Sequence, residues 1–201
     1  MTQLDARQRP HPKPSARAKL ELVRSDRVRA PSRGEPQVKS FPSGSSVRPE
    51  LSCQVESFRA IAYELPPLFE RHYAELAENK DVYPLDPDWE RYFMLEATGT
   101  LRMMTARCEG VLAGYISNLV GPHLHSRQTI FAEIEMFWLD PVYRGGWFAM
   151  KWFRENDAYL KSLGVKLVHV SEKLRFKDGR AGLIFKRLGY RPIEMNFVKA
   201  L

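Results

Sequence analysis

Apolar and polar residues alternate with two different periods, which together predict strands and helices from about residue 52 onward. A period of two predicts strands at 52–58, 101–108, 111–119, 129–139, 165–171 and 190–200. Apolar residues three or four positions apart predict helices at 68–79, 89–99, 147–163 and 181–188. Glu109-Gly110 is a two-residue hairpin turn, and the polar stretch 121–126 predicts a loop.

The strand at 129–139 has the clearest pattern, because its alternation divides eleven residues between two faces. One face is predicted to carry Ile130, Ala132, Ile134, Met136 and Trp138, and the other Phe131, Glu133, Glu135, Phe137 and Leu139. Asp140-Pro141 ends this strand, and the helix and strand that follow complete a strand–helix–strand unit. Such a unit places its two strands parallel.

The order of these elements predicts one α/β domain over residues 51–201. Hairpins in the middle and one late parallel pair predict a mixed, mostly antiparallel sheet, with helices on both faces. About 150 residues are enough to bury a core of this kind.

Composition separates residues 1–50 from the rest of the chain. This segment holds eleven Lys and Arg against five Asp and Glu, which is +6 of the whole chain's net +7. It contains half of the fourteen prolines and one aromatic residue, Phe41. We therefore predict a disordered basic tail. Three interpretations stay open: a solubility tail, an electrostatic tether to nucleic acid or a protein partner, and a start codon placed too early.

Several classes of protein are disfavoured by the rest of the composition. No stretch approaches the ~18 apolar residues of a membrane span, and the N-terminus has no apolar signal run. Cys53 and Cys108 are too few for a disulfide framework or a cysteine-rich metal site, so we expect reduced thiols in a cytoplasmic protein without a bound metal.

The junction at 139–149 is the first candidate for chemistry. Arg144-Gly145-Gly146 lies between a strand end and a helix start, where unpaired N–H groups and the helix dipole favour an anion. Glycine also lets the backbone approach a phosphate closely. Ordinary turn chemistry explains the same residues, so this feature alone is weak.

With these elements in order, the chain resembles the GNAT superfamily of acyl-CoA-dependent N-acetyltransferases. The best-matching motifs are Leu139-Asp140-Pro141-Val142-Tyr143-Arg144-Gly145 and Leu188-Gly189-Tyr190, and the resemblance covers residues 52–201. A weaker resemblance is to acetyltransferase-like proteins of tailed phages. The family implies acetyl-CoA as co-substrate, with its pantetheine arm between the strands at 129–139 and 165–171. Transfer to an amine is then direct, without a covalent enzyme intermediate.

The resemblance assigns coenzyme contacts to one stretch of the chain. These are Phe137, Leu139, Arg144, Gly145, Gly146, Trp147 and Ala149. The Leu139 backbone would orient the acetyl carbonyl. Arg144 matches the leading basic residue of the family's pyrophosphate signature and Ala149 its last small position. Trp147 stands at the fourth position, usually glycine. Either Gly146 takes that role in a shorter turn, or a bulky side chain stands at the phosphate.

Two glutamates are candidates for the general base. Glu135 and Glu133 are about 7 Å apart on one strand face, at ~3.3 Å per residue. The family often uses a strand carboxylate here, and partial burial raises such a pKa toward working pH. The alternative is that both face solvent or pair with Lys or Arg. The family often has a tyrosine acid where this chain has Phe185, so Tyr190 or water would have to replace it.

The sequence therefore predicts an N-acetyltransferase acting on a small-molecule or protein amine, with no membrane association and an open oligomeric state. The alternative is a non-catalytic GNAT-like domain that binds a protein or nucleic acid.

His169, within the strand at 165–171, is predicted to be packed or at the sheet rim rather than catalytic.

Overall fold

A five-stranded sheet is the centre of the computed structural model, which describes residues 50–145, 147–173 and 180–199. The strands follow the chain in the order β1-β2-β3-β4-β5: Leu51–Glu56, Leu101–Cys108, Val111–His123, Ser126–Leu139 and Leu167–Val170. The first three pairs are antiparallel, and β4 and β5 are parallel. This confirms the predicted mixed α/β sheet, while the predicted tail at 1–50 lies almost entirely outside the described residues.

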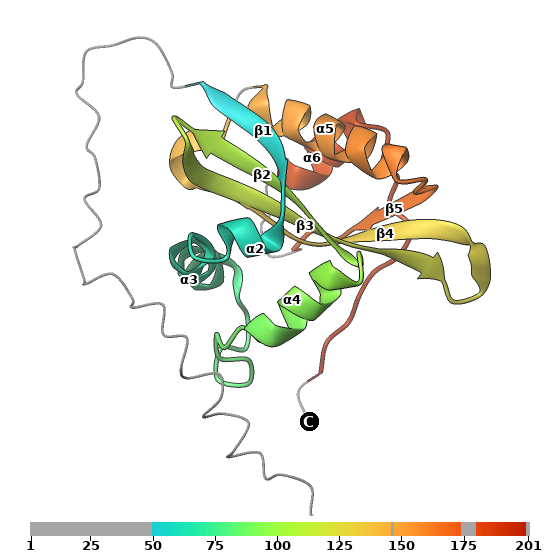
Figure 1. Cartoon of the computed structure of the whole chain (residues 1–201), viewed down its shortest axis with the longest axis horizontal. Helices are drawn as coiled ribbons and strands as arrows, with labels where there is room; N and C mark the ends of the chain where they lie inside the picture. Colours follow the sequence, from blue (N-terminus) through green and yellow to red (C-terminus); the bar gives the residue numbers. More distant parts are fainter. Residues whose placement is uncertain (1–49, 146, 174–179, 200–201) are drawn as a thin grey trace, which may run out of the picture. The chain divides into compact units, whose positions relative to one another are not determined.

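Helices cover both faces of the sheet, as predicted (Figure 1). One face carries α2 (Phe58–Ile61), α3 (Leu65–Leu76) and α4 (Trp89–Ala97). The other carries α5 (Phe148–Ser162) and α6 (Arg180–Arg187), and a short 3-10 turn, η1 (Pro141–Tyr143), follows β4. None of the described helices is long and apolar enough to cross a bilayer.

Each face of the sheet has its own buried apolar cluster. Under α2–α4 the cluster includes Phe58, Leu65, Phe69, Tyr115 and Trp138. Under α5 and α6 it includes Met104, Ile116, Ile134, Trp152, Phe153 and Phe185. Helix α5 buries Trp152, Phe153, Asn156 and Leu160 at helical spacing, which confirms the helix predicted at 147–163.

Several boundaries differ from the sequence prediction for local reasons. The predicted loop at 121–126 is mostly strand, because β3 and β4 continue into a long hairpin that turns at Leu124 and His125. The first strand ends at Glu56, since Ser57 accepts from the Ala60 N–H and starts α2. Helix α3 begins at Leu65 because prolines are tolerated in a first helical turn.

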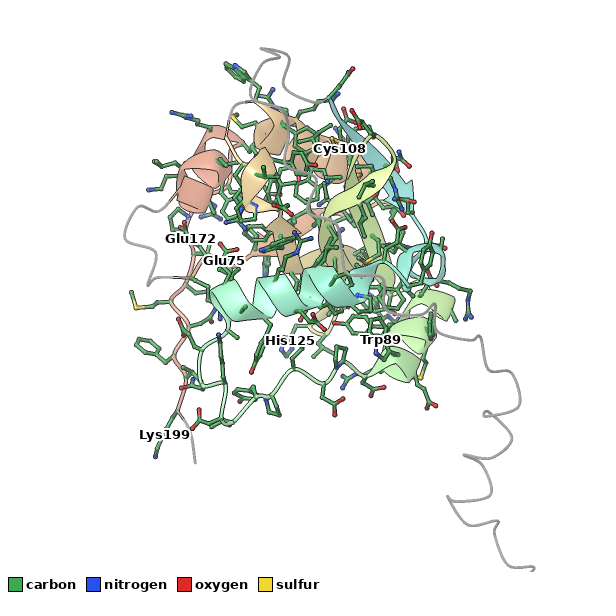
Figure 2. All side chains as sticks on the ribbon, turned by 90° about the vertical axis from the view of Figure 1, so that its left-hand side faces the viewer. Glu75, Trp89, Cys108, His125, Glu172 and Lys199 are labelled. Atoms are coloured by element: carbon green, nitrogen blue, oxygen red, sulfur yellow. The ribbon has the colours of Figure 1, made fainter. Side chains whose placement is uncertain are left out.

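The predicted last strand at 190–200 is wrong for the described residues 190–199. They pair with no strand of the described chain, and residues 191–199 are exposed. Figure 2 places Lys199 at the far end of this extended segment. Alternating apolar residues favour a strand only where a neighbouring edge supplies hydrogen bonds, and none of the described edges does so here.

A β-bulge at Glu135 overturns the predicted faces of β4. Met136 is in register with Ser117, but Ile134 is already in register with Asn118, so Glu135 is an extra residue. As a result the predicted apolar face is split. Ile130, Ala132 and Ile134 pack on the α5 side, whereas Met136 and Trp138 pack under α3.

Candidate functional site

The parallel strands β4 and β5 separate next to the bulge. They are in register from Phe131–Leu167 to Ile134–Val170, and the described pairing stops there. Residues 135–139 of β4 therefore turn an edge toward β5 that has no strand partner within the described chain. Backbone N–H and C=O groups on such an edge need hydrogen-bond partners from another source. We call this region the wedge.

The turn that leaves the wedge leads directly into α5. The Asp140 carboxylate accepts from the Val142 N–H at 3.1 Å and also pairs with Arg71. Gly145 has a φ of +102°, a region that favours glycine, and open space lies where a Cβ would stand. Gly146, predicted to hold phosphate, lies outside the described residues.

Among the described residues, no side chain caps the first turn of α5. Trp147 occupies the N-cap position without a side-chain cap hydrogen bond, and its side chain is 80% exposed. Its bulk therefore points into solvent. Ala149 is small and half-buried in the first turn. A helix start of this kind leaves N–H groups that attract an anion.

The Arg144 side chain is bound by protein groups on three sides. Its Nη1 and Nη2 donate to the two Glu75 carboxylate oxygens at 2.5 and 2.7 Å, and its Nε donates to the Leu139 carbonyl at 2.7 Å. Its guanidinium also lies 5.7 Å from the centre of the Trp138 ring. Glu75 belongs to α3 and lies on its sheet-facing side (Figure 2). Arg144 thus fastens the turn to α3.

Aromatic rings fill the α6 side of the wedge. Phe137 lies 5.3 Å from Phe153 and 5.7 Å from Phe185, between ring centres. Leu139 is almost fully buried in the same cluster. Phe185 carries no ionisable proton, and the Tyr190 hydroxyl already donates to Asp157 at 2.5 Å. Neither side chain therefore offers a free acid.

Glu135 lies on the opposite, α3–α4 side of the wedge. Its side chain has an exposed surface, yet the Ser117 hydroxyl donates to its Oε2 at 3.3 Å. Burial by surrounding protein raises the pKa of Glu135, the Ser117 hydrogen bond opposes this, and the Glu133 charge adds to it. A carboxylate with a raised pKa is a stronger proton acceptor than an ordinary glutamate.

Glu133 lies beside His169 across the β4–β5 pairing. The two residues are in register, with Glu133 Oε2 3.6 Å from His169 Nδ1. Burial raises the pKa of Glu133, His169 lowers it and Glu194 raises it. Within the described residues, neither Glu133 nor Glu135 forms an ion pair with Lys or Arg. His169 lies at the rim, with 30% of its side chain exposed.

A polar cluster that the sequence pattern does not predict lies under α3. His72 Nδ1 lies 2.5 Å from the Tyr115 hydroxyl, and its ring stacks on Trp138. Burial lowers the pKa of His72 to about 4, so the imidazole is neutral at physiological pH. His72 and Glu75 share a helix face by their spacing, but their partners on β3 and β4 are distant in sequence.

Solved acetyltransferases share this architecture, although no protein-family model and no curated sequence matches the chain. An aminoglycoside acetyltransferase from an uncultured soil metagenomic sample superposes with a TM-score of 0.62 at 13% identity, over 76% of this chain and 99% of its own. The Brucella melitensis ribosomal-protein-alanine N-acetyltransferase gives 0.58 at 14%, over 75% and 99%. A Clostridium acetobutylicum predicted acetyltransferase with acetyl-CoA gives 0.57 at 14%, over 75% and 96%. The chain therefore has the GNAT fold.

Proposed function

We propose that this chain transfers an acetyl group from acetyl-CoA to a primary amine. The observation that carries the proposal is the bulge at Glu135, beside the point where β4 and β5 separate. It places a carboxylate of raised pKa next to a strand edge that has no partner in the described chain, and this edge leads to a helix start without a side-chain cap there. These are the three requirements of the reaction: a base, a place for an amide-containing arm and a place for phosphate.

The residues present fit acetyl-CoA. The N–H groups at the start of α5 would hold the pyrophosphate, with Gly145 giving the turn its backbone path. The β4 edge at Phe137 and Leu139 would bind the pantetheine amides as a strand edge binds a peptide. Acetyl-CoA supplies an activated thioester. Arg144 acts by fixing the turn, since its donors are already bound to Glu75 and Leu139.

Glu135 would act as the general base. It takes one proton from the substrate ammonium, so that the nitrogen gains a free electron pair and attacks the thioester carbonyl. The new C–N bond would form and the C–S bond would break; the nitrogen would give its second proton to water, and water would give a proton to the leaving thiolate. Water fills this role because Phe185 has no proton to give and the Tyr190 hydroxyl is bound to Asp157.

The acceptor amine belongs to one of the classes named for the structural neighbours. These neighbours are a ribosomal-protein-alanine N-acetyltransferase, an aminoglycoside acetyltransferase in complex with sisomicin, and a glucosamine-6-phosphate N-acetyltransferase. We would therefore test an alanine-terminated peptide, sisomicin and glucosamine 6-phosphate, and follow the release of free thiol from acetyl-CoA.

A coenzyme-binding experiment tests the proposal without an acceptor. Acetyl-CoA should raise the melting temperature of the full chain in a concentration-dependent way. Gly145→Ala should reduce this rise, whereas Gly110→Ala should leave it intact. The control is matched, because Gly110 also has a positive φ, +81°, and open space at its Cβ, but lies in the β2–β3 turn. Absence of any rise in the unchanged chain would overturn the proposal.

Two observations favour a second candidate, a GNAT-like domain that binds a partner without catalysis. Phe185 stands where an acid is common in the family, and the Arg144 side chain is bound within the protein. If this second function is correct, acetyl-CoA will not raise the melting temperature, and none of the three amines will cause thiol release.

A further inference from the structure

Glu133 and His169 form a pair at the vertex of the wedge that the proposed reaction does not use. Their strands are in register at this point and separate one residue later, after Ile134 and Val170. Both side chains reach solvent, with 36% of Glu133 and 30% of His169 exposed. The pair is therefore accessible to solvent, and the Glu133 charge is close enough to Glu135 to raise its pKa.

The charges around this pair are mainly negative. Glu194 of the C-terminal segment and Glu135 of β4 both interact electrostatically with Glu133. On its other side His169 meets the Phe131 ring, which in turn contacts His123. Among the described neighbours, His169 is the group that can place a positive charge beside Glu133, and only when it is protonated.

We infer that Glu133 is the anchor for the ammonium group of the acceptor, and that protonated His169 competes with the acceptor for it. With His169 neutral, the Glu133 carboxylate is free to pair with an incoming cation. Once protonated, the imidazolium 3.6 Å away supplies that cation itself. Acceptor binding therefore depends on which of the two cations, the imidazolium or the acceptor ammonium, pairs with the Glu133 carboxylate. This inference rests on the proposed function for the location of the acceptor site.

Binding of butylamine, a primary ammonium with no other charge, tests the competition without catalysis. The dissociation constant of the full chain is measured at pH 8.0 and 5.5 from backbone amide shifts of Glu133 and Val170. An exposed ion pair of ordinary strength predicts binding about two- to fivefold weaker at pH 5.5. His169→Gln should remove most of this loss and retain only the part due to protonation of Glu133 itself.

Two further variants make the result decisive. Glu133→Gln should weaken butylamine binding already at pH 8.0, because the anchor is lost. His125→Gln, at the exposed β3–β4 turn, should behave like the unchanged chain at both pH values. The inference is overturned if His169→Gln keeps the full pH dependence, or if Glu133→Gln binds butylamine as well as the unchanged chain.

The outcomes separate this inference from the proposed function. Thiol release with an acceptor, together with pH-independent butylamine binding, would leave the acetyltransferase in place and remove the role of His169. Competition seen in the absence of acetyl-CoA binding would support the ammonium anchor and contradict acetyl transfer.

Discussion

The guanidinium of Arg144 binds both carboxylate oxygens of Glu75, which joins the turn before α5 to helix α3 across 69 positions of the sequence. The indole N–H of Trp138 donates to the same carboxylate at 2.9 Å. A side chain held in this way positions the turn's backbone. Arg144 therefore holds the turn before α5 against α3, and its own side-chain donors are already bound within the protein.

Replacing Glu75 by Gln should lower stability at neutral pH but not in acid. The Arg144 hydrogen bond, more than any other cause, holds the pKa of Glu75 below its ordinary 4.5. A lowered folded-state pKa stabilises the fold above pH 4.5, and this contribution is lost as the pH falls further. Because the pair is partly exposed, we expect a deficit of about 0.5–1 kcal/mol at pH 7.

Urea unfolding of both proteins at pH 7 and pH 3 measures this difference. The deficit of Glu75→Gln should shrink toward zero at pH 3. Glu70→Gln, at an exposed position of the same helix, is the control and should lie close to the unchanged chain at both pH values. A deficit of equal size at both pH values would contradict the clamp.

Local rules were sufficient for most of the fold. The hairpin at Glu109-Gly110 and helix α4 with its Asp88 cap follow from turn chemistry and periodicity, which act between near neighbours in the chain. The bulge at Glu135 could not be predicted in the same way. It is defined by register against β3, and perfect alternation in sequence concealed it.

The candidate site residues lie along the wedge and the turn that follows it, but their contacts could not be predicted from the sequence. The glycine turn and the strand glutamates stand out because their chemistry is local. Packing of the sheet and helices brings together Arg144 and Glu75, and likewise Asn118 and Asn156. The sequence around one residue of such a pair does not identify the other. Tyr190 shows the same limit, since its hydroxyl is bound by an aspartate on α5.

Ser117→Ala should move the acidic limb of the pH–rate profile to higher pH. The Ser117 hydroxyl lowers the pKa of Glu135 against burial, so its removal raises that pKa further. A base must be deprotonated to act, and kcat/KM should therefore fall at a higher pH than in the unchanged chain. Ser126→Ala, at the start of β4, is the control and should leave the limb in place.

Glu135→Gln should lower kcat by about 10²- to 10⁴-fold, the usual contribution of a general base. The acetyl-CoA-dependent rise in melting temperature should persist, because the proposed coenzyme contacts lie elsewhere on β4 and α5. The loss is measured from steady-state rates at saturating acetyl-CoA, with whichever of the three test amines is a substrate. A kcat within threefold of the unchanged chain would assign the base to another group.

Phe185→Tyr should introduce an acid at the cost of stability. Phe185 is 6% exposed and packs on Phe137, Phe153 and Tyr190, so a new hydroxyl there costs about 1–3 kcal/mol if unpaired. The phenol can protonate the leaving thiolate, and kcat should rise in the folded protein. Phe153→Tyr, in the same cluster, should cost similar stability without a gain in kcat. An unchanged kcat in Phe185→Tyr would show that water suffices.

Asn156→Leu should destabilise the fold because it leaves the buried Asn118 side chain without one of its hydrogen-bond partners. Asn118 and Asn156 are fully buried and exchange amide hydrogen bonds of 2.9 and 3.1 Å between β3 and α5. The substitution leaves the Asn118 carbonyl oxygen without this donor, at a cost of about 1–3 kcal/mol. The double variant Asn118→Leu, Asn156→Leu buries no unpaired side-chain amide. Its loss in free energy of unfolding, measured in urea, should therefore be smaller than the sum of the losses in the two single variants. Strict additivity would mean that the two amides act independently.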